Sequence, residues 1–164
     1  MPLLPGMYVC VKTRGFPAWV IRMATRSRVN HAFIVADDQG GIIEARPGGV
    51  RRGSLAAYAG AYAAADTAEP VTGAQRAVVA AKAESMLGTG YNFPAIAGIG
   101  LEDIGWHWRL LMRIARADRD VMCSQLVAAC GEAAGLDWLC GKPSPDQVTP
   151  ADLARRPGVE RVRI

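Results

Sequence analysis

The stretch "NHAFIVADDQGGIIEARPGGV", residues 30–50, constrains the fold of this 164-residue chain most strongly. Two apolar runs rich in β-branched and aromatic residues flank the segment Asp37–Gly41. Its Asp, Gln and Gly residues are typical of the tight turn that joins two antiparallel strands. The stretch therefore predicts a β-hairpin and an antiparallel sheet.

The register of this hairpin decides which side chains meet. Side chains alternate between the two faces of a strand, so a turn that pairs Ala36 with Gly41 places Phe33 opposite Glu44. His31 and Glu44 then lie on one face as diagonal neighbours, within reach of long side chains. A slip of one residue would move them to opposite faces. We expect the first register.

Shorter patterns predict the remaining elements. We expect strands over "MYVCVKT", near Val50 and over "VERVRI". We expect helices over "TGAQRAVVAAKAESMLG" with Thr72 as its N-cap, over "MCSQLVAAC" and over "TPADLA" with Thr149 as its N-cap. Short helices are also expected over "AWVIRMATRS" and from about residue 106 to 116. The Ala- and Tyr-rich stretch that follows Ser54 favours a loose helix or an irregular surface excursion.

Composition is that of one soluble globular domain over residues 1–164, with 51% hydrophobic and 21% charged residues. The N-terminus lacks the charged and apolar regions of a signal peptide, and no apolar stretch is long enough to cross a bilayer. We expect a cytoplasmic protein, or one that is phage-encoded or delivered by another route.

The net charge of +4 comes from clusters of arginine. Solvated faces are the simplest interpretation, and an anionic partner such as a phospholipid headgroup or a cell-wall polymer is the alternative. No nucleic-acid motif accompanies the charge, so we disfavour a nucleic-acid-binding domain, whose affinity would fall steeply with salt.

Cysteine placement carries the chemical signal. The chain has four cysteines and two histidines, with no CxxC pair, and this set completes no zinc pattern. We therefore expect neither metal nor cofactor. Cys123 begins an amphipathic helix, where unpaired backbone N–H groups favour a thiolate. A strand histidine with a neighbouring acid, His31 and Glu44, would supply a base and its orienting group. The alternatives are a buried helix cysteine and a core histidine with satisfied hydrogen bonds.

Five motifs in order resemble a known family: "SRVNHAFIV", "IIEA" with "GV" and "SL", "AKAESMLGTGYNF", "MCSQLV" and "VTPADLA". Together they are similar to the circularly permuted NlpC-type papain-fold proteins of the YiiX type, with the lecithin:retinol acyltransferases as distant relatives. The resemblance covers residues 17–154. It implies an α+β fold, a permuted papain-like domain with an antiparallel sheet packed against helices.

The resemblance also implies roles for particular residues. Cys123 resembles the nucleophile, His31 the general base and Glu44 the third member of the triad. Tyr91 and Ser124 match positions that line the substrate site, although a packing role for Tyr91 is as well supported.

The implied reaction is acyl transfer through a thioester, and an amide such as that of a cell-wall peptide is favoured as the substrate over a lipid ester. The rival class is a non-catalytic binding module on the same scaffold. The insert Gly98–Asp120, with two tryptophans and several arginines, is absent from the family pattern. It is most simply a solvated helix, with a lid, an interface or a membrane-surface helix as alternatives.

Overall fold

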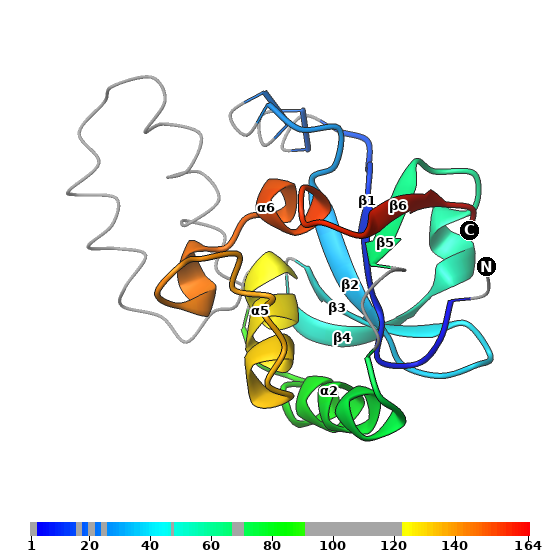
Figure 1. The fold of residues 1–164 in the computed structure, drawn as a ribbon. Helices are drawn as coiled ribbons and strands as arrows, with labels where there is room; N and C mark the ends of the chain where they lie inside the picture. The colour runs from blue at the N-terminus through cyan, green and yellow to red at the C-terminus, as the bar shows by residue number, and fades with distance from the viewer. Residues whose placement is uncertain are drawn as a thin grey trace.

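The fold, obtained as a computed structural model, is described for residues 3–15, 18–19, 22–23, 26–46, 48–66, 71–90 and 123–164. Its centre is a six-stranded antiparallel sheet with the strand order β4-β3-β2-β1-β5-β6 (Figure 1). The strands are β1 (Tyr8–Val11), β2 (His31–Val35), β3 (Gly41–Arg46), β4 (Gly49–Ser54), β5 (Ala63–Asp66) and β6 (Val159–Val162). The helices among these residues are α2 (Gly73–Ser85), α5 (Cys123–Ala133) and α6 (Pro150–Ala154), with short 3-10 turns η1 (Leu55–Tyr58) and η2 (Pro145–Gln147). The predicted α+β class with an antiparallel sheet is confirmed.

The β2–β3 hairpin has the predicted register. The N–H of Ala36 donates to the carbonyl of Gly41 at 2.8 Å, and Phe33 lies opposite Glu44. The turn is held by Asp37, whose Oδ1 accepts from the backbone N–H of Gly41 at 2.7 Å. This register fixes His31 and Glu44 on one face of the sheet.

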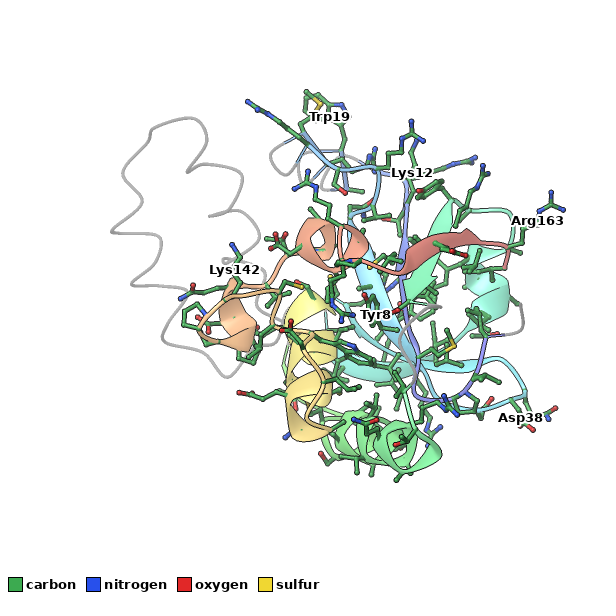
Figure 2. All side chains as sticks on the ribbon, in the orientation of Figure 1. Tyr8, Lys12, Trp19, Asp38, Lys142 and Arg163 are labelled. Carbon is green, nitrogen blue, oxygen red and sulfur yellow. The ribbon has the colours of Figure 1, made fainter. Side chains whose placement is uncertain are left out.

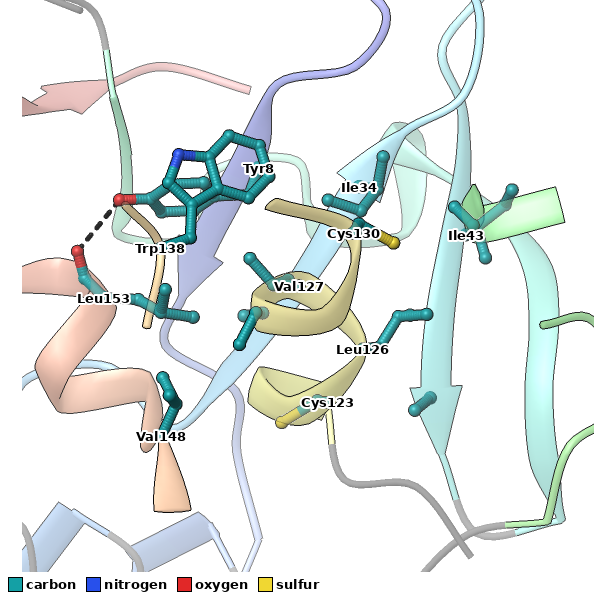
Figure 3. Packing of buried hydrophobic residues seen from close by; sticks show 14 of the residues in the cluster. Tyr8, Ile34, Ile43, Cys123, Leu126, Val127, Cys130, Trp138, Val148 and Leu153 are labelled. Carbon is teal, nitrogen blue, oxygen red and sulfur yellow. Dashed lines mark hydrogen bonds between the residues drawn. The ribbon is translucent and has the colours of Figure 1, made fainter. Parts of the chain in front are cut away.

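The main core lies between the sheet and the helices (Figure 1). Leu126, Val127 and Cys130 on α5 are fully buried against β2 and β3. Figure 3 shows this packing, with Trp138 beside Tyr8 at the end of α5 that is remote from Cys123. The Tyr8 and Trp138 rings meet edge to face with centroids 4.8 Å apart, and Tyr8 also donates to the carbonyl of Leu153. Burial of this apolar area is the main stabilising term of the fold.

A second, smaller core covers the opposite face of the sheet. Val9, Val11, Phe33 and Val35 point to this face and pack against residues that include Tyr58 of η1. His31 alternates in phase with Phe33 and Val35, so the imidazole lies on the same side. This layer places η1 next to the His31–Glu44 pair.

The predicted helix caps are confirmed. Thr72 and Thr149 each form a capping box, with Gln75 and Asp152 as the third residue of the helix. α5 ends before Gly135, which adopts a positive φ of 68° and so terminates the helix.

One sequence prediction is wrong. We expect the region after Ser54 to be loosely helical or irregular, and η1 and the irregular residues 59–62 agree with this, but Ala63–Asp66 forms strand β5 between β1 and β6. The three alanines are buried there, in a strand that pairs with β1 on one side and β6 on the other. The predicted helix over residues 106–116 and the insert Gly98–Asp120 lie outside the described residues. Part of "AWVIRMATRS" lies outside them too, and its described residues 18–19 and 22–23 are helical, as predicted. In the part of the chain that is described, no helix has the length and hydrophobicity to cross a bilayer.

Candidate active site

Cys123 lies in the first turn of α5, at the end of the sheet where strand β2 begins (Figure 3). Its side chain is almost fully buried. The apolar residues that follow at helical spacing, Leu126, Val127 and Cys130, bury the helix against the sheet. Helix packing therefore fixes the position of the sulfur, and the predicted helix start is confirmed.

His31 and Glu44 meet as the hairpin register predicts. Nε2 of His31 lies 2.9 Å from Oε2 of Glu44, and both side chains are buried. The two residues belong to adjacent strands of a rigid sheet, so little conformational entropy is lost in holding this contact.

The side chain of His31 also interacts with the thiol of Cys123, and each shifts the pKa of the other. Since Nε2 faces Glu44, Nδ1 is the ring nitrogen that remains for the sulfur. The imidazole thus lies between a thiol and a carboxylate. Such a pair favours the state in which the sulfur is anionic and the ring is protonated.

The surroundings of the sulfur favour its anionic form. Burial is the largest influence and raises the pKa of the Cys123 thiol. The interaction with His31, together with the backbone N–H groups of Ala32 and Ser124, which donate to the sulfur, lowers it, and the net result is a pKa below the ordinary value. For His31, burial lowers the pKa of the ring, but Cys123 and Glu44 raise it by more, so that the net result is a pKa of about 9. The opposite shifts are those of a thiolate–imidazolium pair.

The other three cysteines behave differently. Burial raises the pKa of the Cys10 thiol strongly, that of Cys130 to about 12 and that of Cys140 to about 11. Among the described residues none of them has a histidine partner, because His31 interacts with Cys123 and Glu44. Within that part of the chain, Cys123 is the thiol in a setting that activates it.

Glu44 is held as a carboxylate by several donors. Its Oε2 accepts from Nε of Arg46 at 3.0 Å and from the hydroxyl of Tyr58, in addition to His31. Its Oε1 lies 3.6 Å from the guanidinium of Arg51. Burial raises the pKa of Glu44, but the hydrogen bonds of His31 and Tyr58 and the positive charges lower it to about 2. Glu44 is therefore ionised throughout the neutral range and fixes the orientation of His31.

Tyr58 is a site residue that the sequence did not indicate. Its ring stacks on His31 with centroids 5.9 Å apart and on Phe33 at 5.0 Å, and its hydroxyl donates to Glu44. Nη2 of Arg46 donates to the same hydroxyl at 2.6 Å. Tyr58 stands 14 residues after Glu44 in an alanine-rich stretch without a motif, so no sequence signal marked it.

The side chain of Ser124 does not line the site, although the sequence predicts that it does. Its side chain is fully buried and donates to the carbonyl of Val148 at 2.6 Å, which ties α5 to the segment before α6. Only its backbone N–H faces Cys123. Any contact of Ser124 with a substrate would therefore involve the backbone. Tyr91 lies outside the described residues.

No three His, Cys, Asp or Glu side chains in the described part of the chain are placed to hold a metal ion together. Cys123, His31 and Glu44 do not converge, because the sulfur and the carboxylate approach opposite nitrogens of one ring. Their arrangement suits proton relay along a line and not coordination around a point.

Comparison with known proteins identifies a structural relative. The fold is similar to that of the metalloprotein yiiX from Escherichia coli O157:H7, a DUF1105 protein, with a TM-score of 0.68. The superposition covers 99% of this chain and 97% of that one at 17% sequence identity. No protein-family model and no curated protein sequence matches the chain. The likeness is one of fold over the whole length.

Proposed function

We propose that this protein is a cysteine-dependent hydrolase or acyltransferase in which Cys123, His31 and Glu44 act as a triad. The observation that carries the proposal is the position of His31, with Glu44 on one ring nitrogen and Cys123 on the other. A nucleophile, a base within hydrogen-bond reach and a group that orients the base are the parts that acyl transfer needs.

The chemistry follows from these positions. The Cys123 thiolate attacks the carbonyl carbon of the substrate and forms a C–S bond. The C–N bond of an amide, or the C–O bond of an ester, then breaks as the His31 imidazolium gives its proton to the leaving group. His31 next removes a proton from water, or from another acceptor, which attacks the thioester and releases the acyl group from Cys123.

The start of α5 supplies charge stabilisation for this reaction. Backbone N–H groups in the first turn of a helix carry partial positive charge and have no partner within the helix. Those near Cys123 would stabilise the oxyanion that forms on the carbonyl oxygen in the transition state. Glu44 keeps His31 oriented and favours its protonated form, as its own hydrogen bonds hold it ionised.

The family resemblance agrees with this assignment. In the permuted NlpC-type papain proteins the strand with the histidine precedes the nucleophile, and here His31 and Glu44 precede Cys123. The likeness in fold to yiiX supports a permuted papain-like domain. We favour hydrolysis of an amide such as a cell-wall peptide, with a lipid ester as the second substrate class.

The name of yiiX as a metalloprotein raises the question of a metal at this site. The residues that the structure describes do not fit one. His31 directs its two nitrogens to opposite partners, and no other donor cluster exists among the described residues. No step of the proposed reaction is routed through a metal.

Trapping the acyl-enzyme tests the proposal. The protein is mixed with 4-nitrophenyl acetate, quenched in acid and analysed by intact-mass and peptide mass spectrometry. Acetyl transfer to Cys123, lost in Cys123→Ser and retained in Cys140→Ser, supports the triad. Cys140 is the matched control because it is a partly exposed thiol with a raised pKa. No acetylation of Cys123 above the level at Cys140 would favour the binding module.

A further inference from the structure

A cleft of about 660 Å³ opens beside the triad. Its walls are Lys12–Arg14, which follow β1, the side chain of Arg46 and the segment Ala57–Tyr62 that joins η1 to β5. These segments meet at the end of the sheet that carries His31, because Val11 pairs with His31 and Ala63. Figure 2 shows Lys12 at this end, far from Asp38 in the β2–β3 turn.

The cleft is positively charged. Lys12, Arg14 and Arg46 line it, and the described lining residues include no Asp or Glu. Arg46 is paired with Glu44. Lys12 and Arg14, by contrast, are exposed and form no ion pair with any described residue. Two cations at a concave surface, without an ion-pair partner in the described part of the chain, create a positive potential that attracts anions.

Two tyrosine rings line the same cleft, and each has a guanidinium over one face. Arg46 lies 5.5 Å from the ring centroid of Tyr58, and Arg161 lies 5.4 Å from that of Tyr62. Guanidinium and ammonium groups bind the oxygens of carboxylates and phosphates through charge-assisted hydrogen bonds. The chemistry of the walls is therefore that of a site for an oxyanion.

The cleft is joined to the triad by direct contacts. Arg46 and Tyr58 line it and both donate to Oε2 of Glu44. On the other wall, the N–H of Thr13 donates to Oδ1 of Asn30 at 3.0 Å, and Nδ2 of Asn30 donates back to Thr13 at 2.6 Å. Asn30 immediately precedes His31. The cleft thus lies on the Glu44 side of His31, opposite Cys123.

We propose that this cleft binds a carboxylate or phosphate group carried by the acyl substrate, so that the protein selects substrates with an anionic group at a distance from the reacting carbonyl. The inference rests on the proposed function for its link to catalysis. The binding of the anion depends only on Lys12, Arg14 and the cleft itself.

The first test measures anion binding directly. ¹⁵N-labelled protein is titrated with acetate and, separately, with inorganic phosphate at constant ionic strength. We expect saturable shifts of the amides of Thr13 and Gly60, lost in the double variant Lys12→Ala/Arg14→Ala. The arm with the tighter binding tells carboxylate from phosphate. Lys82→Ala/Lys142→Ala removes the same charge from α2 and from the loop after α5, which lies far from Lys12 in Figure 2, and should keep the shifts.

The second test compares two activated ten-carbon esters, 4-nitrophenyl decanoate and mono-4-nitrophenyl sebacate, which differ by a terminal carboxylate and are long enough to extend from Cys123 past His31 and Glu44 to the cleft. We expect Lys12→Ala/Arg14→Ala to slow acylation of Cys123 by the sebacate ester about two- to tenfold more than acylation by the decanoate ester, the range expected for partly screened charges. The lysine control should change both rates alike.

The two tests separate the proposals. Shifts that do not saturate with either anion, or that persist in Lys12→Ala/Arg14→Ala, overturn the anion site whatever the reactivity of Cys123. Anion binding without acylation by either ester would contradict the proposed triad and leave the anion site standing. If the wild type and Lys12→Ala/Arg14→Ala acylate Cys123 with the same ester preference, the cleft has no role in substrate selection.

Discussion

Tyr58 and His31 share one acceptor, Oε2 of Glu44, while their rings stack with centroids 5.9 Å apart. The carboxylate is therefore fixed by donors from β2, β3 and η1 at once. A base that is held at one nitrogen and packed on one face has few orientations available, which keeps its other nitrogen directed at Cys123. Such preorganisation is what an acyl-transfer site requires.

Removing the hydroxyl of Tyr58 tests this positioning role. Tyr58→Phe keeps the stacking on His31 and Phe33 but removes a hydrogen bond to a buried carboxylate, so we expect a loss of about 1–3 kcal/mol in the free energy of unfolding. The pH profile of Cys123 alkylation should also move to higher pH, since Glu44 orients His31 less firmly. Tyr58→Leu, which removes the ring as well, should move the profile further. An unchanged profile in both variants would limit Tyr58 to packing.

Glu44→Gln should weaken the ion pair between Cys123 and His31. The amide cannot stabilise a protonated ring as a carboxylate does, so the pKa of His31 falls and that of Cys123 rises. Each unit of that rise lowers the thiolate fraction near neutral pH about tenfold. The alkylation rate of Cys123 against pH measures the change. Glu84→Gln, which alters an exposed ion pair with Arg52, is the control and should leave the profile in place.

Much of the site geometry was predictable from local patterns. The turn Asp37–Gly41 and the alternation of the flanking runs fixed the β2–β3 register, and that register brings His31 to Glu44. The start of α5 at Cys123 followed from its apolar spacing. These features depend on neighbours in sequence or on a single turn, so short-range rules suffice for them.

Features set by tertiary packing were not predictable. Ala63–Asp66 becomes a strand only because β1 and β6 pair with it on both sides, and alanine has no strand preference of its own. Tyr58 reaches Glu44 through the path of η1, which no local signal specifies. Lys12, Arg14 and Arg46 line one cleft because β1 and β3, with β2 between them, end on the same side of the sheet.

The close contact between Gly131 of α5 and Trp138 provides a test of the core packing. A Cβ on Gly131 would lie 2.6 Å from atoms of the buried Trp138 side chain, too close for either to keep its place. We therefore expect Gly131→Ala to destabilise the fold by about 1–3 kcal/mol through overpacking, despite the higher helix propensity of alanine. Gly73→Ala, with open space around its Cβ, should be neutral or slightly stabilising. Urea unfolding of both variants measures the difference, and equal stabilities would contradict the packing of Trp138 on α5.

Acid should destabilise the protein partly through Glu44. Its folded-state pKa of about 2 lies below the ordinary 4.5, so its contribution is fully present above pH 4.5 and is lost as the pH falls towards 2. A shift of this size corresponds to about 3 kcal/mol. The free energy of unfolding of the wild type should therefore fall between pH 5 and pH 2 by more than that of Glu44→Gln. Parallel curves for the two proteins would show that Glu44 is not held as a buried carboxylate.

Activation of the Cys123 thiol by His31 is tested most directly by the rate of iodoacetamide alkylation at Cys123 as a function of pH, in the wild type and in His31→Ala. Peptide mapping separates Cys123 from Cys10, Cys130 and Cys140, whose raised pKa values keep them slow below pH 8. A thiolate–imidazolium pair predicts rapid alkylation of Cys123 well below pH 8 in the wild type, and a shift of the profile to higher pH in His31→Ala. Alkylation of Cys123 no faster than that of an ordinary thiol at every pH, and unchanged by His31→Ala, would contradict it.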